Sequence, residues 1–69
     1  MDDKLIQFVA TFRISIWRDG MPKAADVIAT SIILAEDVDT ATEDALLLAR
    51  AGEVSLRGVT THWRVVSVA

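Results

Sequence analysis

Residues 6–16 constrain the fold more than any other part of the chain, because apolar side chains recur there at every second position. The even positions are Ile6, Phe8, Ala10, Phe12, Ile14 and Ile16. A period of two places these side chains on one face of a β-strand and the odd positions, which include Val9 and Trp17, on the other. The sequence therefore predicts a long, half-buried strand whose even face lies against the core.

A hairpin turn and a second strand are expected next. Asp19 and Gly20 form a strong turn signal, because both central residues of a type I′ turn need positive φ, and Pro22 cannot donate to a ladder. Residues 27–35 are rich in β-branched side chains, which favours a strand over the alternative, a helix opened by Pro22. Such a strand is apolar on both faces and needs cover on both. One face carries Val27, Ala29, Ile33 and Ala35, and the other carries Ile28, Ile32 and Leu34.

A helix is predicted for residues 40–51. Thr40 and Glu43 fit a capping box, Arg50 suits the last turn, and Gly52 suits the position after the last turn. At 100° per residue, Leu47 falls on the polar side. The expected buried face consists of Ala41, Ala45, Leu48 and Ala49, with Leu46 beside it.

The last part of the chain completes an α+β arrangement. Side chains of different kinds alternate over residues 60–68, which predicts a strand. Residues 54–56 could form a further, short strand. The order of elements predicts a single small ββαβ domain over residues 1–69. Its sheet is expected to have three mainly antiparallel strands in the order 2-1-3, with the helix on one face. One twelve-residue helix cannot cover both faces.

This uncovered face leads to the functional prediction. Hydrophobic residues make up 52% of 69 residues, and a chain of this size has little interior in which to bury them. Exposed apolar surface of this kind usually marks an interface. We therefore expect a non-enzymatic protein–protein interaction module that forms a homodimer through the uncovered sheet face. The candidate interface residues are Val9, Trp17, Ile28, Ile32, Leu47 and Trp63.

A second candidate surface, called the acidic patch below, consists of Glu36, Asp37, Asp39, Glu43 and Asp44. Helix capping and the helix dipole account for the last three of these, but not for Glu36 and Asp37. The alternative function is an inhibitor whose acidic patch occupies a basic, nucleic-acid-binding surface of a host protein. Metal binding is not expected, because a calcium loop opening at Asp37 needs glycine and glutamate where Thr42 and Leu48 stand.

The sequence gives no support for catalysis or a cofactor. It has no cysteine, a single histidine (His62), no glycine-rich phosphate loop and no nucleophile elbow. A net charge of −3 disfavours nucleic-acid binding, although Trp17-Arg18 and Trp63-Arg64 could stack bases on a sheet. The N-terminus lacks the basic region of a secretory signal, and no apolar run spans a bilayer, so a cytoplasmic location is expected.

In kind, the chain resembles small acidic α+β proteins that phages and mobile elements encode, among them anti-CRISPR proteins. Such proteins work by occupying a surface of a host protein. The resemblance rests on size, charge and fold class, so it supports the inhibitor alternative without assigning a role to any residue.

Overall fold

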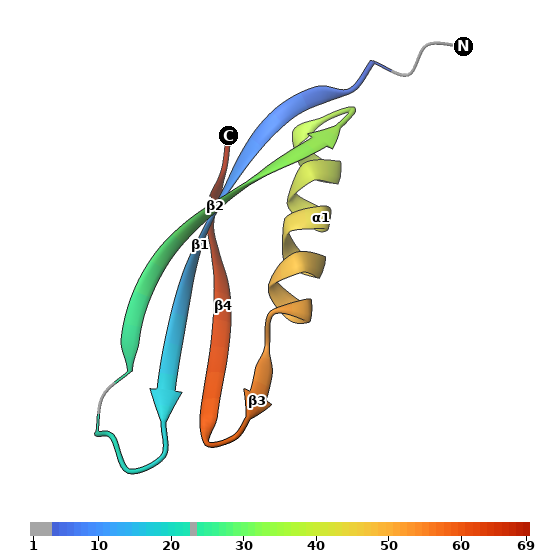
Figure 1. Ribbon diagram of the computed structural model, residues 1–69. Helices are drawn as coiled ribbons and strands as arrows, with labels where there is room; N and C mark the ends of the chain where they lie inside the picture. Colours follow the sequence, from blue (N-terminus) through green and yellow to red (C-terminus); the bar gives the residue numbers. More distant parts are fainter. Residues whose placement is uncertain (1–3, 23) are drawn as a thin grey trace.

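The computed structural model describes residues 4–22 and 24–69, which form a four-stranded sheet and one helix (Figure 1). The elements are β1 (Ile6–Arg18), β2 (Ala25–Ala35), α1 (Val38–Ala51), β3 (Val54–Leu56) and β4 (Val59–Val68). The sheet order is β2-β1-β4-β3, and all neighbouring strands are antiparallel. The α+β class with one helix is confirmed, and β2 is a strand rather than a helix.

The three-stranded prediction is corrected by β3, which adds a fourth strand beside β4. A two-residue turn joins the two strands, with positive φ at Arg57 (52°) and Gly58 (76°), as a type I′ turn requires. The Ser55 and Thr60 hydroxyl groups also lie 3.0 Å apart across the pair. Local turn geometry therefore extends the sheet by a strand of three residues.

Strand β1 organises the sheet because it pairs along its length with two neighbours. Its ladder with β2 runs from Ile6 opposite Ala35 to Ile16 opposite Ala25 without a shift in register. The ladder with β4 shifts between Thr11 and Phe12, where β4 contributes Val66 as an extra residue.

The core lies between α1 and the even-numbered face of β1. Among the described residues, the buried hydrophobic side chains are Ala10, Phe12, Ile33, Ala35, Ala41, Ala45 and Ala49. The three helical alanines recur every four residues and so form one stripe. Short alanine side chains let the helix lie close to the sheet. Leu48, which was expected on the buried face, flanks this stripe and is 44% exposed.

The end of α1 at Ala51 agrees with the prediction, whereas its start does not. The helix begins at Val38 rather than Thr40, because Asp37 is the N-cap and its carboxylate accepts a hydrogen bond of 2.8 Å from the Thr40 backbone N–H. Gly52 ends the helix with φ −81°, not in a left-handed conformation. A Cβ atom at Gly52 would lie 2.5 Å from the Trp63 ring, so this position needs glycine for space.

The molecule is long and thin, measuring 54 × 18 × 14 Å. In Figure 1, α1 lies along one end of the sheet, and the strands continue past the end of the helix. The helix therefore covers only part of one face.

Candidate functional site

The face of the sheet opposite α1, called the outer face below, carries the odd-numbered side chains of β1. Directly paired residues point to the same side of a sheet. Buried Phe12 pairs with Ala29 on the helix side, so Val9 and its partner Ile32 point to the outer face.

A group of exposed aliphatic side chains, called the outer apolar cluster below, occupies part of this face. Its members are Val9, Ile28, Ile32 and Leu34. Ile28 is 59% exposed, Ile32 64% and Leu34 56%, so more than half of each side chain meets solvent. Val9 lies directly opposite Ile32 across the β1–β2 ladder. Three members were predicted interface residues; Leu34 was assigned to the same face from its spacing but was not among the candidates.

Two arginines lie beside this cluster in an unusual arrangement. Arg13 of β1 is directly opposite Arg64 of β4, and like charges at such positions are destabilising. The described residues contain one ion pair, between His62 and Glu53, so neither arginine is paired with a described carboxylate. The sequence did not reveal this opposition, because it depends on a β1–β4 register that contains a bulge.

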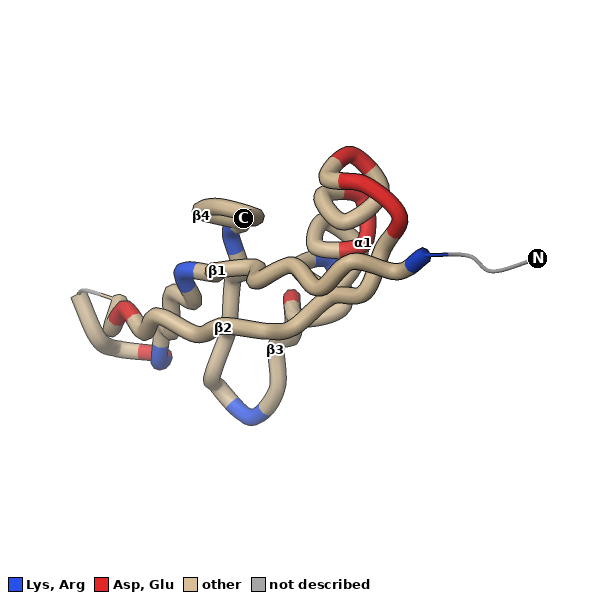
Figure 2. The backbone as a smooth tube through the Cα atoms, turned by 90° about the horizontal axis from the view of Figure 1, so that it is seen from above, with Lys and Arg blue, Asp and Glu red and all other residues tan. Residues whose placement is uncertain are grey.

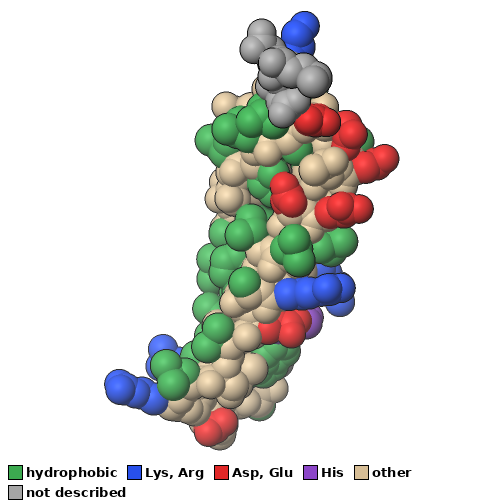
Figure 3. Space-filling view, turned by 90° about the vertical axis from the view of Figure 1, so that its right-hand side faces the viewer, with side chains coloured by type: hydrophobic (Ala, Val, Ile, Leu, Met, Phe, Trp, Pro, Cys, Tyr) green, Lys and Arg blue, Asp and Glu red, His purple; other side chains and the backbone are tan. Residues whose placement is uncertain are grey.

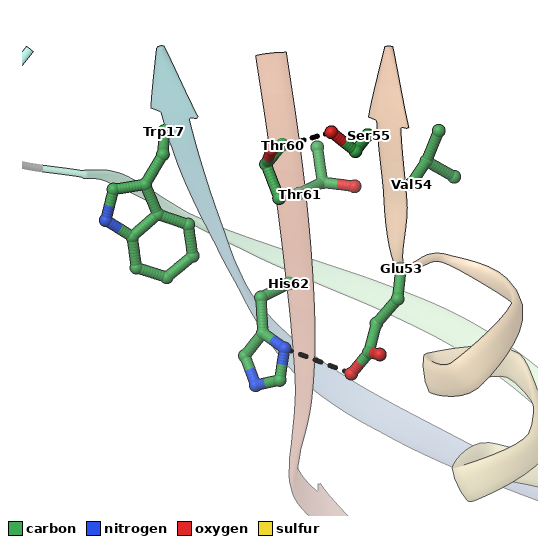
Figure 4. Close-up of a pocket in the computed structure, with 7 residues that line it drawn as sticks. All are labelled: Trp17, Glu53, Val54, Ser55, Thr60, Thr61 and His62. Carbon is green, nitrogen blue, oxygen red and sulfur yellow. Dashed lines mark hydrogen bonds and ion pairs between the residues drawn. The ribbon is translucent and has the colours of Figure 1, made fainter. Parts of the chain in front are cut away.

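An open hollow of about 510 Å³ lies at the far end of the outer face, around Trp17 (Figure 4). It is lined by Trp17, Glu53, Val54, Ser55, Thr60, Thr61 and His62. The His62 Nδ1 atom lies 3.0 Å from a Glu53 carboxylate oxygen, and the Ser55 hydroxyl is engaged by Thr60. Ser55 is therefore not arranged as a nucleophile activated by His62. The hollow is bordered by the Trp17 indole and by the His62–Glu53 imidazole–carboxylate pair.

The structure places two predicted interface residues away from the outer face. Trp63 lies on the helix side, where its ring meets that of Phe12 edge-to-face with centroids 5.4 Å apart. Leu47 is exposed on the helix. Val9, Trp17, Ile28 and Ile32 share one face, whereas Trp63 packs against the core. The two Trp-Arg pairs are likewise split between faces.

The acidic patch surrounds the start of α1. Figure 2 shows the acidic segments gathered in the loop before the helix and in its first turns, and Figure 3 shows carboxylates clustered near one end of the molecule. Asp44 is half-buried, and the other four residues are exposed. None of the five pairs with a described lysine or arginine.

Asp37 differs from the other members of the acidic patch because it has a structural task. Hydrogen bonding from the Thr40 backbone N–H, followed by that from its side chain, lowers the pKa of Asp37 below its usual 3.8. Asp37 therefore needs no ligand to explain it, which corrects the expectation that it lacked a structural role. Glu36 remains without one.

Over the described ranges, no three His, Cys, Asp or Glu side chains gather in a way that could hold a metal ion. No helix within residues 4–22 and 24–69 is long and apolar enough to cross a membrane. Comparison of the chain with protein-family models, curated protein sequences and solved structures gives no match.

Proposed function

We propose that this chain is a non-enzymatic protein–protein interaction module that forms a homodimer through its outer face. The outer apolar cluster is the observation that carries this proposal. Its branched side chains project from paired strands, whose ladder fixes the backbone positions that carry them. A rigid sheet face of this kind loses little conformational entropy on binding.

The total surface of the chain supports the same function. The chain exposes 5321 Å², whereas a folded monomer of its mass is expected to expose about 4,250 Å². The excess of about 1,100 Å² exceeds the roughly 800 Å² that each partner buries in an interface of standard size. Covering one face would therefore bring the exposed area close to that of an ordinary globular protein.

A second copy is the proposed partner because the core of a single chain is small. Five of the seven buried hydrophobic residues in the described part of the chain are alanines. Each alanine buries little apolar area, so burial within the monomer contributes little free energy. Stacking two outer faces would bury eight large aliphatic side chains, four from each outer apolar cluster.

The test uses Val9→Lys, which puts a charge into the outer apolar cluster at an exposed position of β1. We expect the molar mass from light scattering to fall by half relative to the wild type, with an unchanged circular dichroism spectrum. Leu47→Lys is the matched control, because Leu47 is an exposed aliphatic residue on the helix. A wild-type chain that is monomeric at micromolar concentration, or one dissociated by Leu47→Lys instead, would refute the outer-face dimer.

The unpaired carboxylates of the acidic patch favour a second candidate, an inhibitor that docks on a basic host surface. Docking by charge weakens as salt rises, because surface charges are screened beyond about 8 Å at physiological ionic strength. Charge reversal at Glu36 and Asp39 should then abolish capture of the host protein, whereas Val9→Lys should not. Capture that is insensitive to both salt and charge reversal would remove this candidate.

A further inference from the structure

The free edge of β2 is unprotected. An edge strand presents a row of unpaired backbone N–H and C=O groups, and proteins usually guard such edges with proline, lysine, a bulge or a short strand. The edge at β3 is protected because the strand is only three residues long and so presents few unpaired backbone groups. Strand β2 has eleven residues, no proline, no lysine and no shift in its ladder. Its single charge, Asp26, accepts a hydrogen bond of 2.9 Å from the Ser15 hydroxyl of β1.

The sequence of β2 reads almost the same in both directions about Thr30. Residues equally distant from Thr30 are similar in kind, as in Ile28 and Ile32 or Val27 and Ile33. Further pairs are Ala25 with Ala35 and Ala29 with Ser31. A palindromic strand is complementary to a second copy of itself, because antiparallel pairing around a twofold axis brings these equivalent positions together.

A twofold axis perpendicular to the sheet allows few registers. Centring the axis on Thr30 pairs all eleven residues of β2. Moving the centre to Ser31 shortens the pairing and places Asp26 opposite Glu36 of the second copy, where like charges repel. Moving the centre to Ala29 also shortens the pairing and sets Asp26 opposite Ile32. The Thr30-centred register sets Asp26 opposite Leu34. It therefore avoids the repulsion of the Ser31-centred register, and it pairs more residues than either alternative.

From these observations we infer that β2 pairs antiparallel with β2 of a second copy around Thr30, giving one continuous eight-stranded sheet. Eleven residue pairs supply about ten to twelve backbone hydrogen bonds along roughly 37 Å. Ile28 of each copy lies beside Ile32 of the other on the outer face. On the helix side, a hollow of about 430 Å³ lies beside Thr30 and is lined in part by Ala29, Ser31 and Leu48. The β2 strand of the second copy would extend the sheet that forms one wall of this hollow.

Disulfide trapping tests this pairing directly, because the chain contains no cysteine. In the Thr30-centred register, the two Thr30 Cα atoms lie about 4.5–5.5 Å apart, within the span of a disulfide. Thr30→Cys should therefore cross-link to itself under mild oxidation at micromolar concentration. Thr11→Cys is the matched control: Thr11 faces Thr30 across the β1–β2 ladder, yet the two copies of Thr11 would be separated by about 14 Å.

Ser31→Cys checks the register, because Ser31 meets Ala29 and not itself when the axis passes through Thr30. The three variants are compared in the Val9→Lys background as well as alone, so that loss of the outer-face dimer cannot be mistaken for loss of the edge pairing. We expect Thr30→Cys to cross-link at least about tenfold faster than either control. Equal rates for Thr30→Cys and Thr11→Cys would overturn the pairing, and faster cross-linking of Ser31→Cys would overturn its register.

Discussion

At the residue scale, Asp37 ties the acidic patch to the stability of α1. Its carboxylate accepts a hydrogen bond from the Thr40 backbone N–H, which would otherwise lack a partner in the first turn of the helix. The charged form of Asp37 is the one that folding favours. The acidic patch therefore contains one residue that caps the helix, whereas Glu36, Asp39 and Glu43 are exposed and Asp44 is half-buried.

Asp37→Ala should lower the urea midpoint of unfolding at neutral pH, whereas Asp37→Ser should retain most of the stability because serine also caps helices. The pKa of Asp37 is lowered in the folded state. Its contribution is therefore fully present above the unfolded value of about 3.8 and is lost as pH falls through the lower, folded value. Urea titrations should show the wild type and Asp37→Ala converging in strongly acidic solution. A difference that does not narrow as the pH falls would contradict the role of the charged carboxylate.

At the element scale, the contact between the end of α1 and β4 depends on one glycine. The helix closes with backbone bonds from the Gly52 N–H to the carbonyl groups of Leu48 and Ala49, and the Gly52 carbonyl accepts a bond of 2.7 Å from the Thr61 hydroxyl. The indole of Trp63 occupies the space that a side chain at Gly52 would need. This contact sets how closely the C-terminal end of α1 approaches β4.

Gly52→Ala should destabilise the fold, although replacing glycine by alanine in an unstrained, non-left-handed conformation usually stabilises a protein by lowering the entropy of the unfolded chain. Overpacking of this kind typically costs about 1–3 kcal/mol. Chemical denaturation of Gly52→Ala, of Trp63→Leu and of the double variant forms a cycle that isolates the contact. The penalty at Gly52 should largely disappear once Trp63 is removed. Additive effects would show that the two residues do not interact.

The elements differ in how far the sequence could predict them. The alternation in β1 and the two-sided apolar pattern of β2 predicted both strands and their faces, because the side-chain period of a strand follows directly from its backbone. The start of α1 was misplaced because Asp37 and Thr40 both suit a cap, and the sequence cannot show which one the chain uses. The face on which Trp63 lies depends on pairing between distant strands and on the bulge at Val66, neither of which has a local signal.

At the scale of the whole molecule, the sheet is longer than its helix can cover. The radius of gyration is 14.5 Å, whereas a compact chain of this length is expected to have one of about 11 Å. The outer face and the β2 edge are different surfaces, and two contacts with separate twofold axes close into an assembly of four chains when those axes meet at right angles. Both proposed contacts would cover surface that this extended monomer leaves exposed.

If association contributes to stability, the thermal midpoint should rise with protein concentration, because subunits that bind the folded state shift its equilibrium with the unfolded state. We expect this rise for the wild type, and a smaller one for Val9→Lys, when unfolding is followed by circular dichroism over a hundredfold range of concentration. Leu47→Lys should behave like the wild type. A midpoint that is independent of concentration would show that the monomer is stable by itself.

The two tryptophans on opposite faces of the sheet give the chain a pair of built-in fluorescent reporters. Trp63 is held against Phe12 beneath the end of the helix, so its emission should change when the chain unfolds. Trp17 is 42% exposed on the outer face, so its emission should shift toward the blue when a partner removes water from that face. In a Trp17→Phe variant the remaining Trp63 would report folding. In a Trp63→Phe variant the remaining Trp17 would report docking, so neither measurement needs an added dye.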